Sequence, residues 1–507
     1  MTPSEKLAQS LEALRELQNE DGTATIRAKD LSRTHRERLL QHGFIQEVIK
    51  GWYISSKPDE SLGDSTVWYT AFWTFCSDYL NNRFSKEWCL SPEQSLSIHS
   101  GNWTVPQQLL VRSPKGHNNL TNLPYGTSLF DAKLSIPNKR EIVESQGLKL
   151  YSLPMALISS SESYFSKNST DVRTSLTLIK DASDILNPLL EGGHTRAAGR
   201  LAGSFRNIGN IKIADEINKT MIAAGYNVRE NDPFNNTLAF NTYTREKSPY
   251  AQRIRLMWQQ MREPVLEYFP VAPGIPEDIS SYMKQVEDIY TTDAYHSLSI
   301  EGYWVSIELI DRVRSGDWNT ESNHKDKELR NAMAARGYWQ AFQVVKQSIE
   351  KVLDGQNAGN IVDQDHSDWY RELFGPSVTA GLLKPSDLAG YRNGQVYITN
   401  SMHVPLNRDA VRDCMPLLFD LLAKETEASV KAVLGHFIFV YIHPYMDGNG
   451  RIGRFLFNTM LASGGYPWTI IPVESRDTYM NALEQASVNQ DIKPFAKFLA
   501  SLVDKQL

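Results

Sequence analysis

The strongest hydrophobic pattern in the chain lies near its C-terminal end. Residues 428–442 read ASVKAVLGHFIFVYI, a predicted helix that is apolar on nearly all sides and therefore typical of the centre of a helical bundle. The polar stretch HPYMDGNGRIGR follows at 443–454, and IGRFLFNTML is again apolar at helical spacing. The pattern predicts a polar loop held in a fixed position between two core helices.

The rest of the chain divides by periodicity. Residues 277–507 are almost wholly helical in pattern, whereas 231–276 is a linker rich in Asn, Pro and Thr around one amphipathic helix. Residues 57–230 combine helices with the strand-like pieces WTVPQQLLVRS and LKLYSLPMALI, which indicates an α+β domain. We therefore expect a mainly α protein with an all-α C-terminal domain.

The first 56 residues predict a winged helix-turn-helix. AKDLSRTHRERLLQHGFIQEVIKGWYI reads as a short helix, a turn at Ser32, a second helix and two strands that turn at Lys50-Gly51. Residues 27–50 contain six basic and three acidic residues, so this segment is positively charged in a chain of formal charge −6. Arg33, Arg36 and Arg38 would project from the second helix toward DNA phosphates and base edges. The same pattern also suits a winged helix that docks a protein.

Composition narrows the class further. A chain of 507 residues with 41% apolar residues has room for three or four domains. The three cysteines form no CxxC pair, so neither a disulfide framework nor a zinc site is supported, and we expect a reducing, cytoplasmic location. The N-terminus has no apolar signal region and the longest apolar run is too short for a bilayer, so we expect no membrane span.

The 443–454 loop carries the pattern of a phosphate site. Gly448 and Gly450 permit backbone conformations that let amide groups converge on an anion. The next helix begins near Asn449, and its first turn presents unpaired N–H groups and the positive end of the helix dipole. Arg451 and Arg454 are three residues apart, so both reach the same side of that turn.

Two further loop residues extend this chemistry to catalysis. Asp447 is a carboxylate beside the phosphate site, and Mg²⁺ prefers one or two carboxylates together with phosphate oxygens. His443 has an ordinary pKa of about 6.5, so its imidazole is largely neutral at pH 7 and can accept a proton from a hydroxyl. Base, metal carboxylate and anion site together predict nucleotide-dependent phosphoryl or nucleotidyl transfer.

HPYMDGNGRIGR resembles the signature of the Fic family, His-x-Phe-x-Asp/Glu-Gly-Asn-Gly-Arg-x-x-Arg, with Tyr445 at the phenylalanine position. The resemblance covers about residues 280–505. It implies that His443 deprotonates a Ser, Thr or Tyr hydroxyl of a target protein, which attacks the α-phosphate of ATP and takes AMP. Asp447 would then hold Mg²⁺, Asn449 would orient the α-phosphate, and residues 448–451 would cradle the β-phosphate. The Doc-like branch has a lysine at the position of Gly450, so this glycine favours AMP transfer.

Two other segments resemble parts of the same family. YRNGQVYITNSMHVP is similar to the flap, and Asn393-Gly394 predicts a β-hairpin turn. An unpaired edge at Val396, Tyr397 and Ile398 could take up a target segment by strand addition, although a plain surface hairpin fits the same residues. ESRDTYMNALEQ is similar to the helix beside the adenine pocket, which makes Tyr479 a candidate nucleotide contact.

YHSLSIEGYW at 295–304 resembles the family's inhibitory motif, Ser/Thr-x-x-x-Glu-Gly/Asn, through Ser297, Glu301 and Gly302. The resemblance implies that Arg454 binds the γ-phosphate of ATP. A carboxylate paired with Arg454 in a bidentate salt bridge would occupy this arginine and add negative charge where the γ-phosphate must lie. Glu301 also fits an ordinary exposed helix residue. We expect an inhibitory helix near 293–304.

The first 230 residues resemble AbiEi-type antitoxins and regulators, through QHGFIQEVIKGWYI, SLPMALI and GRLAGSFRNIG. Two functions follow from the whole sequence. The first is an autoinhibited protein adenylyltransferase that uses ATP and Mg²⁺ on a target protein. The second is a DNA-binding regulator in which the Fic core senses nucleotides. The sequence names neither the target nor a DNA operator, and it leaves open whether the chain forms a homo-oligomer.

Overall fold

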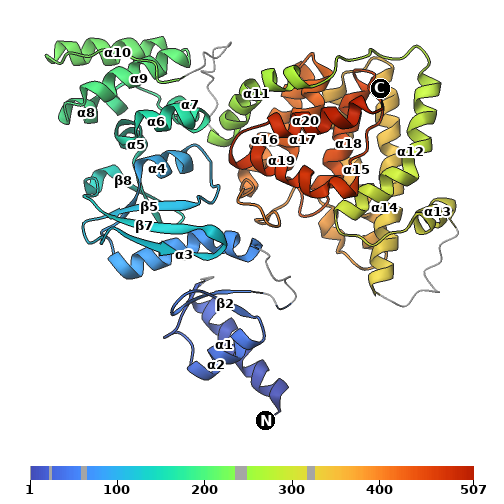
Figure 1. The fold of residues 1–507 in the computed structure, drawn as a ribbon, viewed down its shortest axis with the longest axis horizontal. Helices are drawn as coiled ribbons and strands as arrows, with labels where there is room; N and C mark the ends of the chain where they lie inside the picture. Colours follow the sequence, from blue (N-terminus) through green and yellow to red (C-terminus); the bar gives the residue numbers. More distant parts are fainter. Residues whose placement is uncertain are drawn as a thin grey trace. The chain divides into compact units, whose positions relative to one another are not determined.

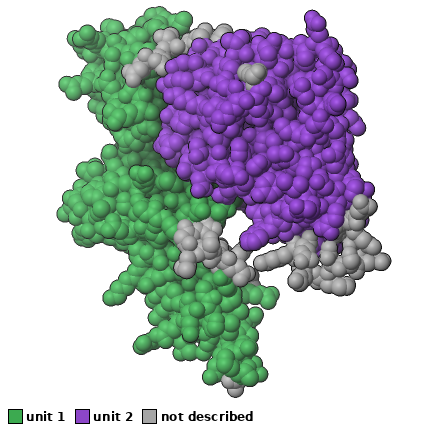
Figure 2. Space-filling view, turned by 45° about the vertical axis from the view of Figure 1, so that its right-hand side comes forward, with its two compact units in different colours: residues 1–249, 397–404 green, residues 250–396, 405–507 purple. Residues whose placement is uncertain are grey.

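The computed structural model describes residues 2–21, 25–56, 58, 65–234, 248–316 and 326–506. The chain divides into two units, one of residues 1–249 with 397–404 and one of residues 250–396 with 405–507 (Figure 2). Helices predominate in Figure 1, and the strands lie in the first unit, which confirms the mainly α fold predicted from the sequence.

The first 56 residues form helices and a small antiparallel sheet of strand order β1-β3-β2. The elements are α1 (Pro3–Asp21), β1 (Thr25–Arg27), α2 (Arg33–Gln41), β2 (Ile45–Ile49) and β3 (Trp52–Ser55). The short helix predicted before Ser32 is wrong, because residues 28–31 form a turn. Asp30 accepts hydrogen bonds from the backbone and side chain of Arg27, and Ser32 caps α2 instead. The assignment as a winged helix stays a prediction.

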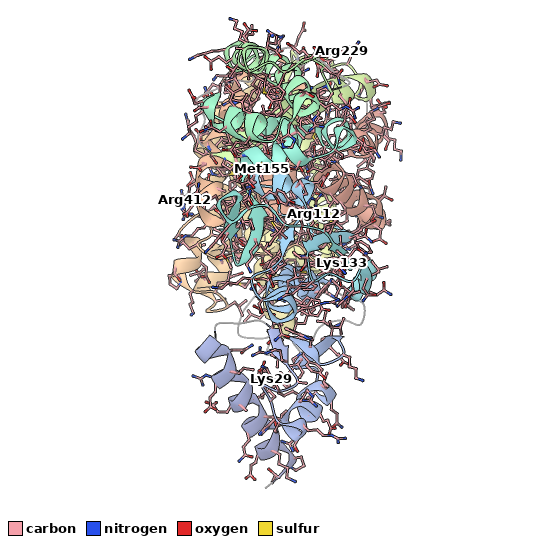
Figure 3. All side chains as sticks on the ribbon, turned by 90° about the vertical axis from the view of Figure 1, so that its left-hand side faces the viewer. Lys29, Arg112, Lys133, Met155, Arg229 and Arg412 are labelled. Atoms are coloured by element: carbon pink, nitrogen blue, oxygen red, sulfur yellow. The ribbon has the colours of Figure 1, made fainter. Side chains whose placement is uncertain are left out.

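The remainder of the first unit combines a four-stranded sheet of order β4-β5-β7-β6, a hairpin of β8 and β9, and helices. Figure 3 labels Arg112 on β5 and Lys133 at the end of β7, the parallel central pair. The elements are α3 (Thr66–Phe84), β4 (Cys89–Leu90), α4 (Pro92–His99), β5 (Gln108–Ser113), β6 (Asn119–Asn122), β7 (Ser128–Lys133), β8 (Ile142–Ser145), β9 (Leu148–Tyr151), α5 (Leu153–Ser159), α6 (Glu162–Lys167), α7 (Ser169–Thr177), α8 (Ser183–Glu191), α9 (Thr195–Asn207) and α10 (Ile211–Ala223). The strand-like stretch 148–158 is a strand only as far as Tyr151, because Pro154 lies in the first turn of α5.

Residues 397–404 belong to the first unit although they are distant in sequence. Met402 and Val404 pack against the apolar core around α3, and the Val105 amide donates a hydrogen bond to the Met402 carbonyl oxygen, with an N–O distance of 2.9 Å. The Asn400 side chain accepts a hydrogen bond of 3.0 Å from the Ser65 amide at the start of α3. The first unit is therefore completed by a segment from far along the chain.

The second unit is a helical bundle around one large apolar core. Its helices are α11 (Pro249–Tyr268), α12 (Ile279–Ile300), α13 (Ile307–Ser315), α14 (Asp326–Leu353), α15 (Ala358–Thr379), α16 (Arg408–Lys424), α17 (Ala428–Ile442), α18 (Asn449–Ala462), α19 (Arg476–Val488) and α20 (Lys493–Asp504). The helix expected within the linker is α11, and its side chains Ile254, Met257 and Met261 lie in this core. No helix in the described parts of the chain combines the length and the apolar character that crossing a membrane requires.

Candidate active site

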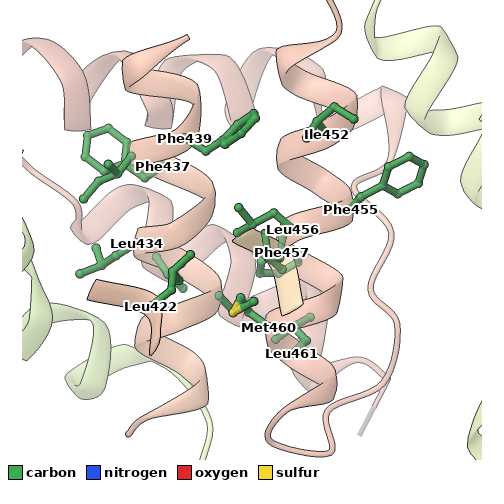
Figure 4. Packing of buried hydrophobic residues seen from close by; sticks show 14 of the residues in the cluster. Leu422, Leu434, Phe437, Phe439, Ile452, Phe455, Leu456, Phe457, Met460 and Leu461 are labelled. Carbon is green, nitrogen blue, oxygen red and sulfur yellow. The ribbon is translucent and has the colours of Figure 1, made fainter. Parts of the chain in front are cut away.

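The predicted loop between two core helices is formed by the end of α17 and the start of α18. All but two residues of α17 are buried, and every residue of α18 except Gly450 is buried. Figure 4 shows the apolar side chains of both helices, with Phe437 and Phe439 on α17 and Ile452 and Phe455 on α18. Tight packing on both sides leaves the connecting loop little freedom to move.

Backbone conformation sets the shape of this loop. His443 ends α17 in the left-handed region, with φ 55° and ψ 62°, and Gly448 precedes α18 with φ 82°. The Asn449 side chain accepts a hydrogen bond from the Tyr445 amide and donates one to the Tyr445 carbonyl oxygen, both at 2.9 Å. The Asn449 side chain therefore helps to close the loop, and its expected role at the α-phosphate stays a prediction.

Arg451 provides one buried cation at the first turn of α18. Its side chain is 1% exposed, and the guanidinium carbon lies over the rings of Tyr303 and Phe374, at 5.1 and 4.9 Å from their centroids. Among the described residues its Nε and Nη2 atoms have no hydrogen-bond partner, although Nη2 lies 3.5 Å from Asp447 Oδ2. Buried donors without acceptors are costly, so this guanidinium is suited to an anionic ligand.

Arg454 provides the second buried cation, and α12 already occupies most of its donors. Its Nε donates to Ser297 Oγ at 2.9 Å, and its Nη2 donates to Ser297 O at 3.0 Å and to Glu301 Oε1 at 2.7 Å. The expected bidentate salt bridge is wrong, because Glu301 uses one oxygen and the Ser297 hydroxyl takes the place of the other. Burial alone would lower the pKa of Arg454, but the Glu301 carboxylate raises it above its ordinary value.

The absence of a side chain at Gly450 leaves room for the Glu301 side chain. Glu301 caps the C-terminal end of α12, and Gly302 follows it with φ 80°, the left-handed conformation typical of glycine after a helix. A side chain at position 450 would place its Cβ atom 2.2 Å from Glu301 Oε1. The glycine therefore leaves space beside Arg454 that the glutamate occupies.

His443 is partly buried, with its Nδ1 atom 3.2 Å from the Val440 carbonyl oxygen. A carbonyl oxygen only accepts hydrogen bonds, so this contact requires a proton on Nδ1 and leaves the lone pair of the neutral ring on Nε2. Burial lowers the pKa of His443 to about 4, and Arg392 contributes to the lowering. The imidazole is therefore neutral at physiological pH and can accept a proton.

Asp447 is the candidate metal carboxylate. Its side chain is 62% exposed, and its Oδ1 accepts a 2.6 Å hydrogen bond from the Gly448 amide. The described residues contain no cluster of three or more His, Cys, Asp or Glu side chains that could hold a metal ion. A cation here would therefore take most of its ligands from phosphate oxygens and water, a pattern that suits Mg²⁺.

Tyr479 is buried, and its hydroxyl lies 2.8 Å from Nε2 of His436, a buried residue of α17. Burial raises the pKa of Tyr479 to about 12 and lowers the pKa of His436 to about 3, so both groups are neutral. In this structure the hydroxyl of Tyr479 thus joins α19 to α17. A contact between Tyr479 and a nucleotide stays a prediction.

The predicted β-hairpin at 391–400 is wrong, because the structure assigns no strand to residues 391–407. Side chains satisfy the backbone there instead of a strand ladder. Arg392 donates to the carbonyl oxygens of Gly394 and Leu406, and Gln395 Nε2 donates to that of Pro405 at 2.8 Å. Val396 is buried and Tyr397 and Ile398 are half-buried, so these three residues do not form an open strand edge.

The three arginines predicted to contact DNA differ in exposure. Arg33 is highly exposed and pairs with Glu37 on the same helix face at 2.6 Å. Arg36 donates to the Ala28 carbonyl oxygen, and Arg38 donates to the Lys6 carbonyl oxygen on α1. Two of the three therefore contribute to packing within the first unit, and DNA binding stays a prediction.

Several residues around the site were not found from the sequence. Tyr303 and Phe374 enclose Arg451, and Arg392 contacts the backbone of His443. Asp293 on α12 is buried and accepts hydrogen bonds from Tyr338 and Trp468. Only the spacing of Asp293, Ser297 and Glu301, four residues apart on one helix face, offered a signal.

The fold and the loop together give a helical core with two buried arginines near a helix N-terminus. Residues 365–461 match the Fic/DOC family, so this part of the chain is a Fic domain. The chain is 28% identical over 242 residues to Protein adenylyltransferase Fic of Drosophila willistoni, covering 46% of this chain and 44% of the relative. The relative of the same name from Nematostella vectensis is 26% identical over 259 residues, covering 50% and 56%. The chain thus spans about half the length of these curated relatives.

Solved structures give weaker likenesses. Fic-1 from C. elegans is 17% identical, covers 66% of this chain and 86% of that chain, and has a TM-score of 0.38. A Fic domain containing signaling protein from Bacteroides thetaiotaomicron is 20% identical, covers 50% and 93%, and has a TM-score of 0.33.

Proposed function

We propose that this chain is a protein adenylyltransferase that transfers AMP from ATP to a Ser, Thr or Tyr hydroxyl of a target protein and is held inactive by Glu301. One observation carries the proposal. Arg451 and Arg454 are both buried near the start of α18 with donors that lack acceptors among the described residues, and a glutamate forms an ion pair with one of them. This arrangement suits a polyphosphate whose last anionic group competes with Glu301. The relatives' shared name supplies the reaction type.

The residues divide the reaction between binding and proton transfer. The backbone amides at the start of α18 and the Arg451 guanidinium hold the phosphates, and Arg454 binds the terminal phosphate when Glu301 leaves it. Mg²⁺ bound at Asp447 would neutralise phosphate charge. His443 Nε2 accepts the proton of the target hydroxyl. The hydroxyl oxygen then bonds to the α-phosphorus, the bond from this phosphorus to the bridging oxygen breaks, and pyrophosphate leaves.

Glu301 inhibits AMP transfer through its negative charge and through the space that its side chain occupies. Its carboxylate neutralises Arg454 and lies where a side chain at position 450 would stand, so it fills the space next to both residues. A terminal phosphate near Arg454 would meet a second negative charge in a poorly solvated site. A nucleotide bound in that state has its α-phosphate displaced from His443.

The test compares the wild type with Glu301→Gly, using ATP labelled on the α-phosphate in one sample and on the γ-phosphate in another. Loss of an inhibitory coupling of ordinary size raises protein labelling by about tenfold or more. The label appears only from α-labelled ATP, and His443→Ala in the same background abolishes it.

Glu277→Gly is the matched control, because Glu277 is an exposed glutamate before α12. It leaves labelling at the wild-type level. Equal labelling of wild type and Glu301→Gly would remove the inhibitory role, and label from γ-labelled ATP would replace AMP transfer by phosphorylation.

A further inference from the structure

Arg392 is a buried cation whose side chain donates hydrogen bonds to carbonyl oxygens. Its side chain is 2% exposed. Its Nε donates to the His443 carbonyl oxygen at 2.7 Å, its Nη1 donates to that of Gly394 at 2.9 Å, and its Nη2 donates to that of Leu406. Burial and the neighbouring Arg412 lower the pKa of Arg392 to about 10. Within the described ranges no carboxylate forms an ion pair with it, so carbonyl dipoles alone compensate its desolvation.

The contacts of Arg392 gather at the C-terminal end of α17. The last carbonyl groups of a helix lack partners within the helix, and a cation there is favoured by the helix dipole. Arg392 Nη2 lies 3.5 Å from the Ile442 carbonyl oxygen, and the Arg392 amide donates to the Pro444 carbonyl oxygen at 2.9 Å. Arg392 thus contacts three consecutive residues, 442–444, with the general base in the middle.

The middle residue is the one whose backbone is strained. His443 has φ 55°, a left-handed conformation that is uncommon for residues other than glycine and needs support from its surroundings. The 2.7 Å hydrogen bond from Arg392 Nε holds the carbonyl group of this same residue. Since the Cα atom of His443 lies between that carbonyl and the imidazole, a shift of the backbone would move the ring.

We infer that Arg392 is a positioning residue for the base, which fixes the backbone of His443 so that Nε2 points at the incoming hydroxyl. This inference rests on the proposed function. Arg392 does not act on ATP, because its donors are occupied by carbonyl oxygens of the protein. Arg392 also binds the carbonyl oxygens of Gly394 and Leu406, so these two residues and His443 share one anchor within the second unit.

The test places Arg392→Lys and Arg392→Gln in the Glu301→Gly background. A misplacement of the base of about 1 Å lowers the rate of AMP transfer by about 100-fold. The KM for ATP stays within about twofold, because Arg451 and Arg454 are untouched. Lysine keeps the charge but has fewer directed donors, so it restores only part of the rate. Arg408→Gln, at an exposed arginine on α16, is the control and keeps the parent rate.

A second measurement does not depend on transfer. In protein labelled with ¹³C-histidine, the imidazole signal of His443 is identified by its loss in His443→Ala. Arg392→Gln is expected to shift this signal, while Arg408→Gln leaves it in place. If Arg392→Gln does not fold, the His443 signal of Arg392→Lys is compared with that of the parent protein instead.

The outcomes separate the two proposals. An unchanged His443 signal together with an unchanged rate would overturn the positioning role of Arg392. If the Glu301→Gly parent, with Arg392 intact, transfers no AMP, the proposed function is overturned, whereas a shifted His443 signal in Arg392→Gln would still leave the positioning role standing.

Discussion

His443 is the proposed general base, and its burial sets the pH range that we expect for AMP transfer. Burial lowers its pKa to about 4, so protonation of the imidazole, which removes the lone pair on Nε2, begins only in acid. We predict that AMP transfer by Glu301→Gly stays constant as pH falls through 6.5, the ordinary histidine value, and declines only near the lowered pKa. The rate at saturating ATP, measured from pH 8 to pH 4, tests this.

Protein stability must be followed over the same range. A histidine with a lowered pKa binds fewer protons in the folded state than in the unfolded state, so it removes stability as pH falls below about 6.5. Circular dichroism at each pH separates unfolding from titration of the base. A decline in rate centred at 6.5 in folded protein would contradict the lowered pKa.

At the scale of single residues, the sequence predicted functional residues that are adjacent in the chain better than contacts between residues that are far apart in the chain. The glycines, arginines and histidine of the loop stand in one twelve-residue stretch, so their spacing alone places them on one helix end. Arg392 is 51 residues from His443 and acts through carbonyl groups, which every residue possesses. No residue pattern marks such a contact. The loop-closing hydrogen bonds of the Asn449 side chain were likewise not visible in the sequence, because they depend on the shape of the folded loop.

Helix α12 acts as one element with three anchors on one face. Asp293 accepts hydrogen bonds from Tyr338 Oη at 2.6 Å and from Trp468 Nε1 at 3.0 Å, while Ser297 and Glu301 accept from Arg454. We predict that Ser297→Ala raises labelling by α-labelled ATP by up to about tenfold, since one hydrogen bond to a charged group is lost.

Glu301→Gly should raise labelling further than Ser297→Ala, because it removes the competing charge itself. Initial rates of labelling at equal protein concentration give the comparison. Ser299→Ala is the control, since Ser299 lies on the same helix turn and its side chain is only half-buried. Equal rates for Ser297→Ala and Ser299→Ala would show that the Ser297 hydroxyl does not hold α12 on Arg454.

At the scale of elements, long periodic helices were predicted well and short segments were not. The apolar residues of α17 cover nearly all sides of the helix and those of α18 recur at helical spacing, and in a packed bundle such helices must lie in the core. Asn393-Gly394 is a strong local hairpin signal, but Arg392 and Gln395 take the carbonyl oxygens that a partner strand would need. Residues 28–31 likewise use side-chain hydrogen bonds in place of a helix. Hydrogen bonds from side chains compete here with those of a helix or a strand and determine the conformation of a short segment. The periodicity of apolar residues does not reveal such hydrogen bonds.

At the scale of the whole molecule, the assignment of residues 397–404 to the first unit could not be predicted, because the sequence places them inside the Fic domain. Asn400 has φ 57°, and its Oδ1 accepts hydrogen bonds from the Ser65 amide at 3.0 Å and the Ser65 hydroxyl at 3.2 Å. Ser65 is the N-cap residue of α3 but makes no side-chain capping bond. Asn400 therefore stabilises the start of a helix that lies 335 residues earlier in the chain.

This contact predicts that Asn400→Gly loosens the start of α3. Glycine accepts the left-handed backbone without strain, so the change isolates the lost acceptor, and losing a capping contact costs about 1 kcal/mol. Hydrogen exchange at residues 65–68 of the full chain should quicken by about fivefold. Gln146→Gly is the control, because Gln146 is exposed and also left-handed, with φ 49°. The same exchange rates at 65–68 in both variants would mean that the Asn400 side chain does not secure α3, and that residues 397–404 are held by the packing of Met402 and Val404.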